Sequence, residues 1–315
     1  MRIGVDIMGS DHGPVVPIKG AVLASKELPA GVRLVLLGDE AAIRAGLRAE
    51  GAAEADFDII PSRDDITMGD HATKALASKP ESSIALGFRL MKQGALDAFA
   101  STGNTGAMLV GSVMVLKPLP GVQRPCITSI MPKADGRFGL MVDVGANADC
   151  KPEVLFQFGL LGSLFAQHVY NIEAPKVGLL SIGEEEKKGN ALTLAAHALM
   201  KGTDRFNFIG NVEGRDLFLD KADVVVCDGF TGNVVLKALE AFHDLVKKRG
   251  GDDPFLDRFD YQNYGGTPVL GVDGTVMIGH GISNAGTIKN MLLLTRQVVE
   301  SKLHERIHEA FEQPA

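Results

Sequence analysis

Short apolar runs recur along the chain, and most of them end in a turn of small or polar residues. Such runs predict β-strands at Ile3–Ile7, Arg33–Leu37, Phe57–Ile60, Ala98–Ser101, Cys126–Met131, Phe138–Val144, Val177–Ile182, Phe206–Ile209, Ala222–Cys227 and Thr275–Ile278. Helical periodicity between them predicts, for example, helices at Glu81–Gly94, Asn104–Lys117, Lys151–Tyr170, Asn190–Lys201, Thr231–Arg249 and Ser283–Ala310. This alternation predicts an α/β fold with a largely parallel sheet.

One pair of predicted strands is expected to be antiparallel. Cys126–Met131 and Phe138–Val144 are separated by residues 132–137, a spacing that fits a hairpin, so the sheet should be mixed. With 315 residues, we expect a single large α/β domain over residues 1–315, with a small helical excursion at about 238–263. The segment Gly250–Pro254 interrupts the helical pattern and is a candidate linker.

Turns rich in Gly, Asn and Asp follow many of these strands. They span residues 8–14, 101–106, 143–149, 183–190, 210–214 and 228–233. Any one of them can be explained as an ordinary turn with a helix cap. Because the carboxyl ends of parallel strands share one edge of a sheet, the whole set favours one ligand-binding cleft. The turn at 228–233 precedes a predicted helix, whose N-terminus would attract an anion.

Charge and cysteine content narrow the function classes. A net charge of −7 argues against nucleic acid as the main partner. Cys126, Cys150 and Cys227 lack CxxC spacing, which predicts small buried side chains in a reduced, cytoplasmic compartment. The uncharged runs Ala98–Leu116 and Val154–Ile172 contain glycines or amides and fit core or interface segments better than membrane spans. An acid as early as residue 6 does not fit a signal peptide.

Several known motifs are absent or incomplete. "HERIH" at His304–His308 matches the zinc pattern HExxH, but its neighbours are typical of a solvated terminal helix. The chain has no GxGxxG or GxSxG, and "GEEEKKGN" lacks the Gly-Lys-Ser/Thr ending of a phosphate loop. We therefore expect no metal, no cofactor and no covalent serine or cysteine mechanism.

The motifs together resemble one family. "DIMGSDHGP", "ASTGNTGAML", "DVGANADCKPE", "IGEEEKKGN", "GNVEGRD", "DGFTGNVVLK" and "YGGTPVLGVDG" are similar, in wording and order, to the PlsX family, the phosphate acyltransferases of bacterial phospholipid synthesis. The resemblance covers the chain from Ile3 to about residue 300. It implies a three-layer fold like that of phosphotransacetylases and isocitrate- or isopropylmalate-type dehydrogenases, and a homodimer. It also implies acyl transfer from acyl carrier protein to inorganic phosphate, giving acyl phosphate for a downstream membrane acyl-phosphate acyltransferase.

The implied chemistry needs no protein nucleophile, because phosphate is itself an anionic nucleophile. The protein must position phosphate and stabilise the oxyanion that forms on the thioester. We expect Lys188 to be the cation at the reacting oxygen, with Lys187 solvated beside it. Asn233 and Asn190 can donate amide hydrogens. Lys188 and Asn233 are the predicted catalytic residues.

The predicted substrate-binding residues lie in the same turns. They are Gly9, Asp11, His12, Asn104, Thr105, Gly106, Asp143, Asn147, Asn190, Asp228, Thr231 and Gly232. Backbone N–H groups of helix N-termini at the Gly9, Gly106 and Gly232 turns are expected to hold phosphate. The acids and amides at 104, 143, 147 and 228 would orient either the turns or the phosphate. Asp6 and Asp11 are interpreted as loop-shaping residues, and His12 as either a base or a loop or substrate contact.

The chain departs from the family pattern at 238–263, where members often carry a longer helical insertion. Its apolar residues beside Lys247–Arg249 could form a peripheral membrane patch at the inner face of the membrane, or pack at a dimer edge. Alternative functions are a phosphotransacetylase-like enzyme for short acyl-coenzyme A, or a phosphate- or nucleotide-binding module without turnover. A decarboxylating dehydrogenase is disfavoured because its acid cluster and nicotinamide signature are not evident.

Overall fold

The computed structural model describes residues 1–251, 253–260 and 263–312. The candidate linker and the helical excursion both include residues outside these ranges. Two compact units are present, one formed by Met1–Pro118 with Tyr261–His304 and the other by Leu119–Asp260 with Glu305–Ala315. The expectation of one domain stays a prediction, and each unit is described below by itself.

The first unit contains a sheet in which five neighbouring strands are parallel. Its spatial order is β3 (Asp58–Pro61), β2 (Arg33–Gly38), β1 (Arg2–Asp6), β4 (Ala98–Ser101), β11 (Thr275–Ile278) and β10 (Thr267–Leu270). Only β10 runs antiparallel to its neighbour β11. Val5 of β1 pairs with Leu36 on one side and Ala100 on the other, and all three are buried. The near-continuous apolar strands follow from coverage of both faces by helices.

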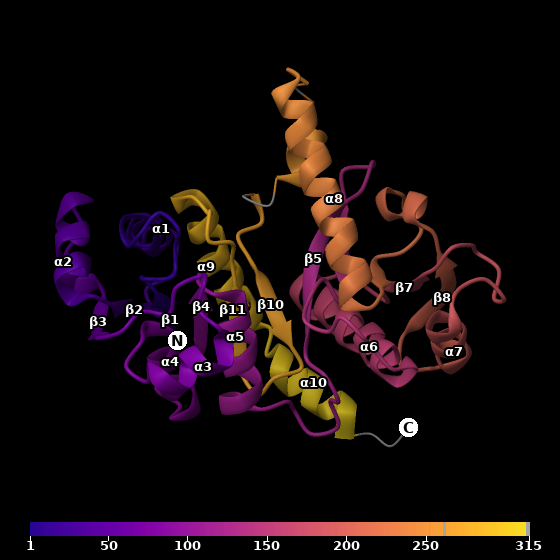
Figure 1. Cartoon of the computed structure of the whole chain (residues 1–315), viewed down its shortest axis with the longest axis horizontal. Helices are drawn as coiled ribbons and strands as arrows, with labels where there is room; N and C mark the ends of the chain where they lie inside the picture. The colour runs from indigo at the N-terminus through magenta and orange to yellow at the C-terminus, as the bar shows by residue number, and fades with distance from the viewer. Residues whose placement is uncertain (252, 261–262, 313–315) are drawn as a thin grey trace. The chain divides into compact units, whose positions relative to one another are not determined.

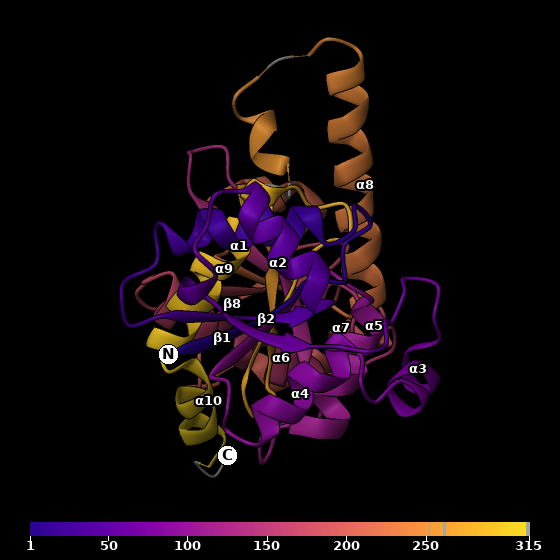
Figure 2. The ribbon, with the colours of Figure 1, turned by 90° about the vertical axis from the view of Figure 1, so that its left-hand side faces the viewer.

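Helices lie on both faces of this sheet (Figures 1 and 2). Helices α1 (Val15–Ser25) and α9 (Ala285–Glu300) lie on one face, and α4 (Ser83–Lys92) and α5 (Thr105–Gly111) on the other. Gly20 allows α1 to approach α9 closely, since a Cβ there would lie 2.6 Å from Ile288. Helices α2 (Glu40–Ala49) and α3 (Ala72–Ser78) complete the unit, with a short 3₁₀ turn at Glu54–Asp56.

The second unit contains a mixed sheet. Its spatial order is β5 (Cys126–Pro132), β6 (Phe138–Val142), β9 (Val224–Val226), β7 (Lys176–Leu180) and β8 (Asn207–Val212). The β5–β6 pair is the predicted antiparallel hairpin, and the other pairs are parallel. Helix α6 (Pro152–Val169) packs on this sheet through Gly162, against Val142 and Val224. Helices α7 (Ala191–Met200) and α8 (Gly229–Lys248) and the 3₁₀ segments Gly214–Phe218 (η3) and Leu256–Phe259 (η4) also belong to this unit.

Two predicted helices are wrong in their extent. The helix predicted over Ser283–Ala310 is two helices, α9 and α10 (Leu303–Glu312), because Lys302 adopts a left-handed φ of 53° that interrupts the helix. The helix predicted over Asn104–Lys117 is α5 followed by a π-helical turn at Ser112–Leu116. None of the described helices is both long and apolar enough to span a membrane.

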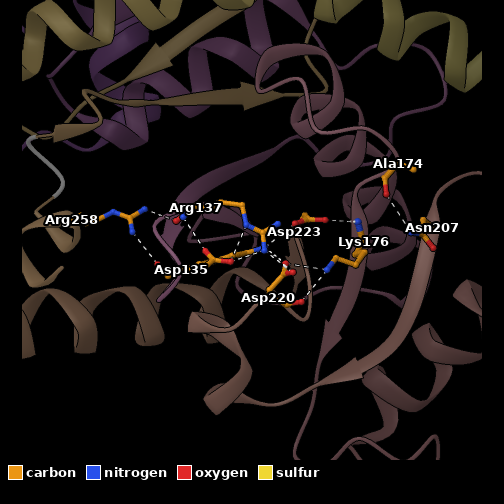
Figure 3. A network of polar contacts seen from close by, with 9 residues as sticks. Asp135, Arg137, Ala174, Lys176, Asn207, Asp220, Asp223 and Arg258 are labelled. Carbon is orange, nitrogen blue, oxygen red and sulfur yellow. Dashed lines mark hydrogen bonds and ion pairs between the residues drawn. The ribbon is translucent and has the colours of Figure 1, made fainter.

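A network of charges ties together one end of the second unit's sheet (Figure 3). Lys133 at the end of β5 is only 1% exposed, and its Nζ lies 2.8 Å from an oxygen of Asp223. Asp220 binds Arg137 at 2.6 Å and Lys176 at 3.1 Å. A buried charge that loses its partner destabilises a fold strongly, so the Lys133–Asp223 pair should be needed for the hairpin to keep its place.

The same network holds η4. Arg258 donates to the carbonyl oxygens of Lys133, at 3.0 Å, and of Arg137. Phe259 packs edge-on against Phe218, with ring centroids 5.5 Å apart. The 3₁₀ segment η4 is therefore anchored to the β5–β6 hairpin.

Candidate functional site

In the first unit, the loop after β1 packs against the turn after β4. Asp6 is 2% exposed, and its carboxylate accepts hydrogen bonds from Ser101 Oγ at 2.6 Å and Met8 N at 3.0 Å. Burial raises the pKa of Asp6, and the hydrogen bond from Ser101 opposes that rise. A Cβ on Gly9 would lie 2.4 Å from Asp6 Oδ2 and 2.6 Å from the nitrogen of Gly103. Asp6 thus shapes this loop, and glycine at position 9 permits the close approach.

The later residues of this loop are less buried. The backbone nitrogen of Asp11 donates to the carbonyl oxygen of Gly281 at 2.9 Å, and Asp11 and His12 are exposed residues. Helix α1 begins only at Val15. The expectation that Gly9 belongs to a helix N-terminus is therefore wrong, because residues of the loop separate it from the helix.

Asn104 is a structural residue of the turn after β4. It is 7% exposed, and its Oδ1 caps α5 by accepting from the nitrogen of Ala107 at 2.9 Å. Its Nδ2 donates to three carbonyl oxygens of the loop 67–70, at 3.0, 3.3 and 3.0 Å. Of the two predicted roles, the geometry favours orientation of the turn. Thr105, which is exposed, and Gly106 follow in the first turn of α5.

In the second unit, Asp143 organises the turn after β6. Its carboxylate is fully buried and accepts from the nitrogens of Ile127 (3.1 Å), Ala146 (3.2 Å) and Asn147 (2.7 Å). Burial raises the pKa of Asp143, and these hydrogen bonds oppose the rise. The amide of Asn147 donates to Asp143 at 3.0 Å and to the carbonyl of Pro125 at 2.8 Å. Both side chains therefore orient the turn.

Helix α8 begins at Gly229, two residues before the predicted Thr231, with Asp228 as its N-cap. Asp228 accepts from the backbone nitrogen and the hydroxyl of Thr231, both at 2.8 Å. The nitrogen of Gly229 donates to the carbonyl of Asn147 at 2.8 Å, and that of Gly232 to the carbonyl of Asp228 at 3.0 Å. These N–H groups are satisfied within the protein, so the expectation that Thr231 and Gly232 offer free backbone donors to phosphate is wrong.

The side chain of Asn233 instead remains available. It is exposed on the second turn of α8, and its Nδ2 donates to the carbonyl of Val144 at 3.1 Å. An amide nitrogen carries two hydrogens, so the second can serve a ligand. A Cβ on Gly232 would lie 2.0 Å from the carbonyl oxygen of Asp143. Glycine at position 232 thus lets α8 pack against the turn 143–147. Asn233, the next residue, therefore lies beside that turn.

The loop after β7 carries Lys188 and has a defined main chain. The nitrogen of Lys188 donates to the carbonyl of Glu185 at 2.9 Å, and its carbonyl accepts from Ser181 Oγ at 3.0 Å. Gly189 has a φ of 133°, which favours glycine. Asn190 caps α7, where its Oδ1 accepts from the nitrogen of Thr193 at 2.9 Å.

The charged side chains of this loop differ in whether they form ion pairs. Two of its glutamates pair with lysines outside the loop, Glu184 with Lys221 at 2.8 Å and Glu186 with Lys201 at 2.7 Å. Across the described parts of the chain, neither Lys187 nor Lys188 forms an ion pair, and both are exposed. The positive charge of Lys188 is therefore free to act on a bound anion.

Topology places the second unit's site loops at one edge of its sheet. Strands β6, β9 and β7 are parallel neighbours, and the turn 143–147, the N-terminus of α8 and the loop 181–190 follow them in that order. Contacts join the turn 143–147 to α8. Among the described residues, no direct contact joins Lys188 to Asn233.

Some residues that shape the sites were not predicted. Asn211 lies in the motif "GNVEGRD", is 4% exposed, and donates to the carbonyl of Glu185 in the Lys188 loop at 3.0 Å. The sequence analysis placed it in the turn 210–214, whereas the structure places it on β8. As for metals, residues 1–251, 253–260 and 263–312 contain no cluster of three or more His, Cys, Asp or Glu side chains suited to one.

The fold defines a class. A phosphotransacetylase from Streptococcus pyogenes superposes with a TM-score of 0.68 at 17% identity, covering 99% of this chain and 94% of that one. A branched-chain phosphotransacylase from Enterococcus faecalis V583 superposes with a TM-score of 0.64 at 14% identity, covering 95% and 99%. The mixed sheet with helices therefore has the phosphotransacetylase-like fold that was predicted.

Sequence comparison then identifies the family. The model of a family described as "Fatty acid synthesis protein" matches residues 1–252. Phosphate acyltransferases from Desulforamulus reducens (41% identical, covering 99% of this chain and 98% of the relative) and Geobacter sulfurreducens (40%, covering 99% and 94%) match nearly end to end. The chain belongs to this fatty acid synthesis protein family, the PlsX family of phosphate acyltransferases, as its motifs predicted.

Proposed function

We propose that this protein transfers a long-chain fatty acyl group from acyl carrier protein to inorganic phosphate. The reaction forms a bond between a phosphate oxygen and the thioester carbon, breaks the carbon–sulfur bond, and releases the carrier thiol. Family membership supports an acyltransferase, and the phosphotransacylase-like fold supports phosphate as the acceptor. We place the reaction in the cytoplasm, with acyl phosphate passing to an acyl-phosphate acyltransferase in the membrane.

The observation that carries the proposal is the arrangement at the carboxyl edge of β6, β9 and β7. A rigid turn built on Asp143 presents the amide of Asn233, and the neighbouring loop presents the unpaired ammonium of Lys188. The amide can hold phosphate without any change of protonation. The ammonium can stabilise the negative charge that develops on the thioester oxygen, the interaction that usually contributes most to such catalysis.

Acyl carrier protein and coenzyme A are the two donors to distinguish, because the structural neighbours of this fold include phosphotransacetylases. Palmitoyl-carrier protein or palmitoyl-coenzyme A would be incubated with the enzyme and phosphate, and free thiol and acyl phosphate followed with time. We expect phosphate-dependent thiol release with the carrier and much slower release with coenzyme A. Equal rates would favour a phosphotransacetylase-like enzyme, and no release from either donor would favour a binding module.

A further inference from the structure

Asn211 on β8 bridges α7 and the loop that carries Lys188. Its Oδ1 lies 3.0 Å from Nδ1 of His197, and its Nδ2 donates to the carbonyl of Glu185 at 3.0 Å. Because a carbonyl only accepts, the amide nitrogen must face Glu185, and the amide oxygen then faces the ring. His197 therefore carries a hydrogen on Nδ1, and both ends of the Asn211 amide are occupied.

The support behind the amide is buried. Asn211 is 4% exposed and His197 is 6% exposed. The ring of His197 also packs edge-on against Phe208, with centroids 5.2 Å apart. A side chain that is hydrogen-bonded at both ends in a buried site has a single orientation. Asn211 can therefore hold the loop that carries Lys188 in one position.

Asn211 and the backbone nitrogen of Lys188 donate hydrogen bonds to the same carbonyl group. The oxygen of Glu185 accepts from Asn211 Nδ2 and from the nitrogen of Lys188, at 3.0 and 2.9 Å. The loop's ion pairs at Glu184 and Glu186 involve carboxylates whose side chains are 55% and 58% exposed. Exposed pairs contribute little and are screened by salt. The hydrogen bond from Asn211, whose own side chain is buried, is thus the stronger restraint on the backbone next to Lys188.

We infer that Asn211, held by His197, is a positioning residue for Lys188. It fixes the main chain from which the lysine side chain reaches the reacting oxygen. The role rests on the proposed function, in which Lys188 stabilises the oxyanion. It extends the site to a buried pair on β8 and α7 that does not touch substrate.

Two substitutions separate the hydrogen bonds of Asn211. Asn211→Leu removes both, whereas Asn211→Asp keeps an acceptor for His197 and loses the donor to Glu185. We expect each variant to lower kcat about tenfold, the effect of one misplaced hydrogen-bonded group. The carrier concentration at half-saturation should change little. The matched control is Asn207→Leu on the same strand, whose amide contacts the carbonyl of Ala174 at 3.3 Å (Figure 3) and whose loss should stay within about twofold.

A double variant tests whether Asn211 acts through the lysine. In a Lys188→Ala background, Asn211→Leu should cause no further loss, because the group it positions is already gone. Losses that multiply would overturn the positioning role. So would an Asn211→Leu enzyme with kcat within about twofold of the wild type.

Amide hydrogen exchange gives a readout that does not depend on acyl transfer. Peptides covering residues 183–189 should exchange faster in both Asn211 variants and at the wild-type rate in Asn207→Leu. Unchanged exchange in the Asn211 variants would overturn the role. Faster exchange in a protein whose wild type transfers no acyl group would instead refute the proposed function alone. If Asn211→Leu does not fold, the nearly isosteric Asn211→Asp carries each measurement.

Discussion

At the scale of single residues, acids and amides at the second unit's strand ends mainly hold backbone in place. Asp143 and Asp228 each accept hydrogen bonds from neighbouring N–H groups. The amide of Asn147 links Asp143 to the carbonyl of Pro125. Side chains whose hydrogen bonds are already made within the protein are poor ligands, but they hold the neighbouring backbone in place. We therefore predict that the chemistry uses side chains that leave donors or charge exposed, above all Lys188 and Asn233.

Lys188→Ala should lower turnover severely while the protein stays folded. Loss of one donor that stabilises an oxyanion typically costs about 100- to 1000-fold, or about 3–4 kcal/mol of transition-state stabilisation. The change leaves the backbone contacts of residue 188 with Ser181 and Glu185 in place. Steady-state kinetics with acyl carrier protein would measure it.

Lys187→Ala is the matched control, since Lys187 is an equally exposed neighbour, and its effect should be mild. A Lys188→Ala enzyme with turnover within about threefold of wild type, a difference under ~1 kcal/mol, would show that this lysine has another role.

Asn233→Ala should also raise the phosphate concentration at half-saturation, because the amide contacts bound phosphate in the ground state too.

The sequence alone named these residues as candidates but did not identify their partners. The strand-end turns could be predicted because Gly, Asn and Asp follow apolar runs. The partner of Asn104 could not, because the loop 67–70 is distant in sequence and carries no turn signal that points to it. Asn211 was missed for a related reason. It lay in the predicted turn 210–214, and its role becomes clear only when the facing carbonyl of Glu185 is known.

At the scale of elements, the start of α8 explains one clear difference from expectation. Asp228 caps the helix at Gly229, so the backbone N–H groups of Gly229, Thr231 and Gly232 already bind the protein. The sequence favours a cap at Asp228, yet the apolar periodicity begins later, and the predicted helix start followed that periodicity. The break between α9 and α10 was not predicted either, because lysine is an unusual residue for the left-handed conformation that Lys302 adopts.

The charge network at the β5–β6 hairpin should make part of the protein's stability sensitive to acid. Arg137, followed by Lys176, lowers the pKa of Asp220 below its ordinary value. A lowered folded-state pKa means that the stabilisation is present above the unfolded-state pKa, near 4, and is lost as the pH falls below it. Asp220→Asn should therefore lower the free energy of unfolding at pH 6 and remove part of its fall between pH 6 and pH 3.

Urea unfolding at the two pH values would measure this difference. Asp220 is partly exposed, so high salt should shrink the effect. Asp204→Asn, at an exposed acid of the same unit outside the network, is the control and should keep the wild-type pH dependence. A wild type and Asp220→Asn variant with parallel pH profiles would contradict the assignment.

At the scale of the whole molecule, the second unit leaves one long helix with little cover. Only Gly229 and Gly232 of α8 are buried, and its exposed apolar side chains share one face: Phe230, Val234, Phe242 and Leu245, which are 52–66% exposed. The run Val154–Ile172 was predicted to be a core or an interface segment, and the burial of most apolar side chains of α6 favours the core. The face of α8 is therefore our candidate for an apolar interface in this unit.

We predict a twofold-symmetric homodimer that buries this face of α8, because a monomer would expose a continuous apolar stripe. Light scattering at micromolar protein should give twice the 33.4 kDa mass of the chain. Leu245→Glu should shift the mass toward the monomer, whereas Leu199→Glu, at an exposed leucine of α7, should not. A wild-type monomer under these conditions would rule the dimer out.

The close fit between α8 and the turn at Asp143 also limits how this site can change over evolutionary time or in a mutant library. A methyl group at position 232 would overlap a carbonyl oxygen, and one at position 229 would lie 2.7 Å from another. Selection for activity from fully randomised codons should recover glycine at both positions. Phe230, between them, is 66% exposed in the single chain, so the turn does not limit its side chain and only the predicted dimer face does. Mutant libraries of this site should therefore leave both glycines unchanged.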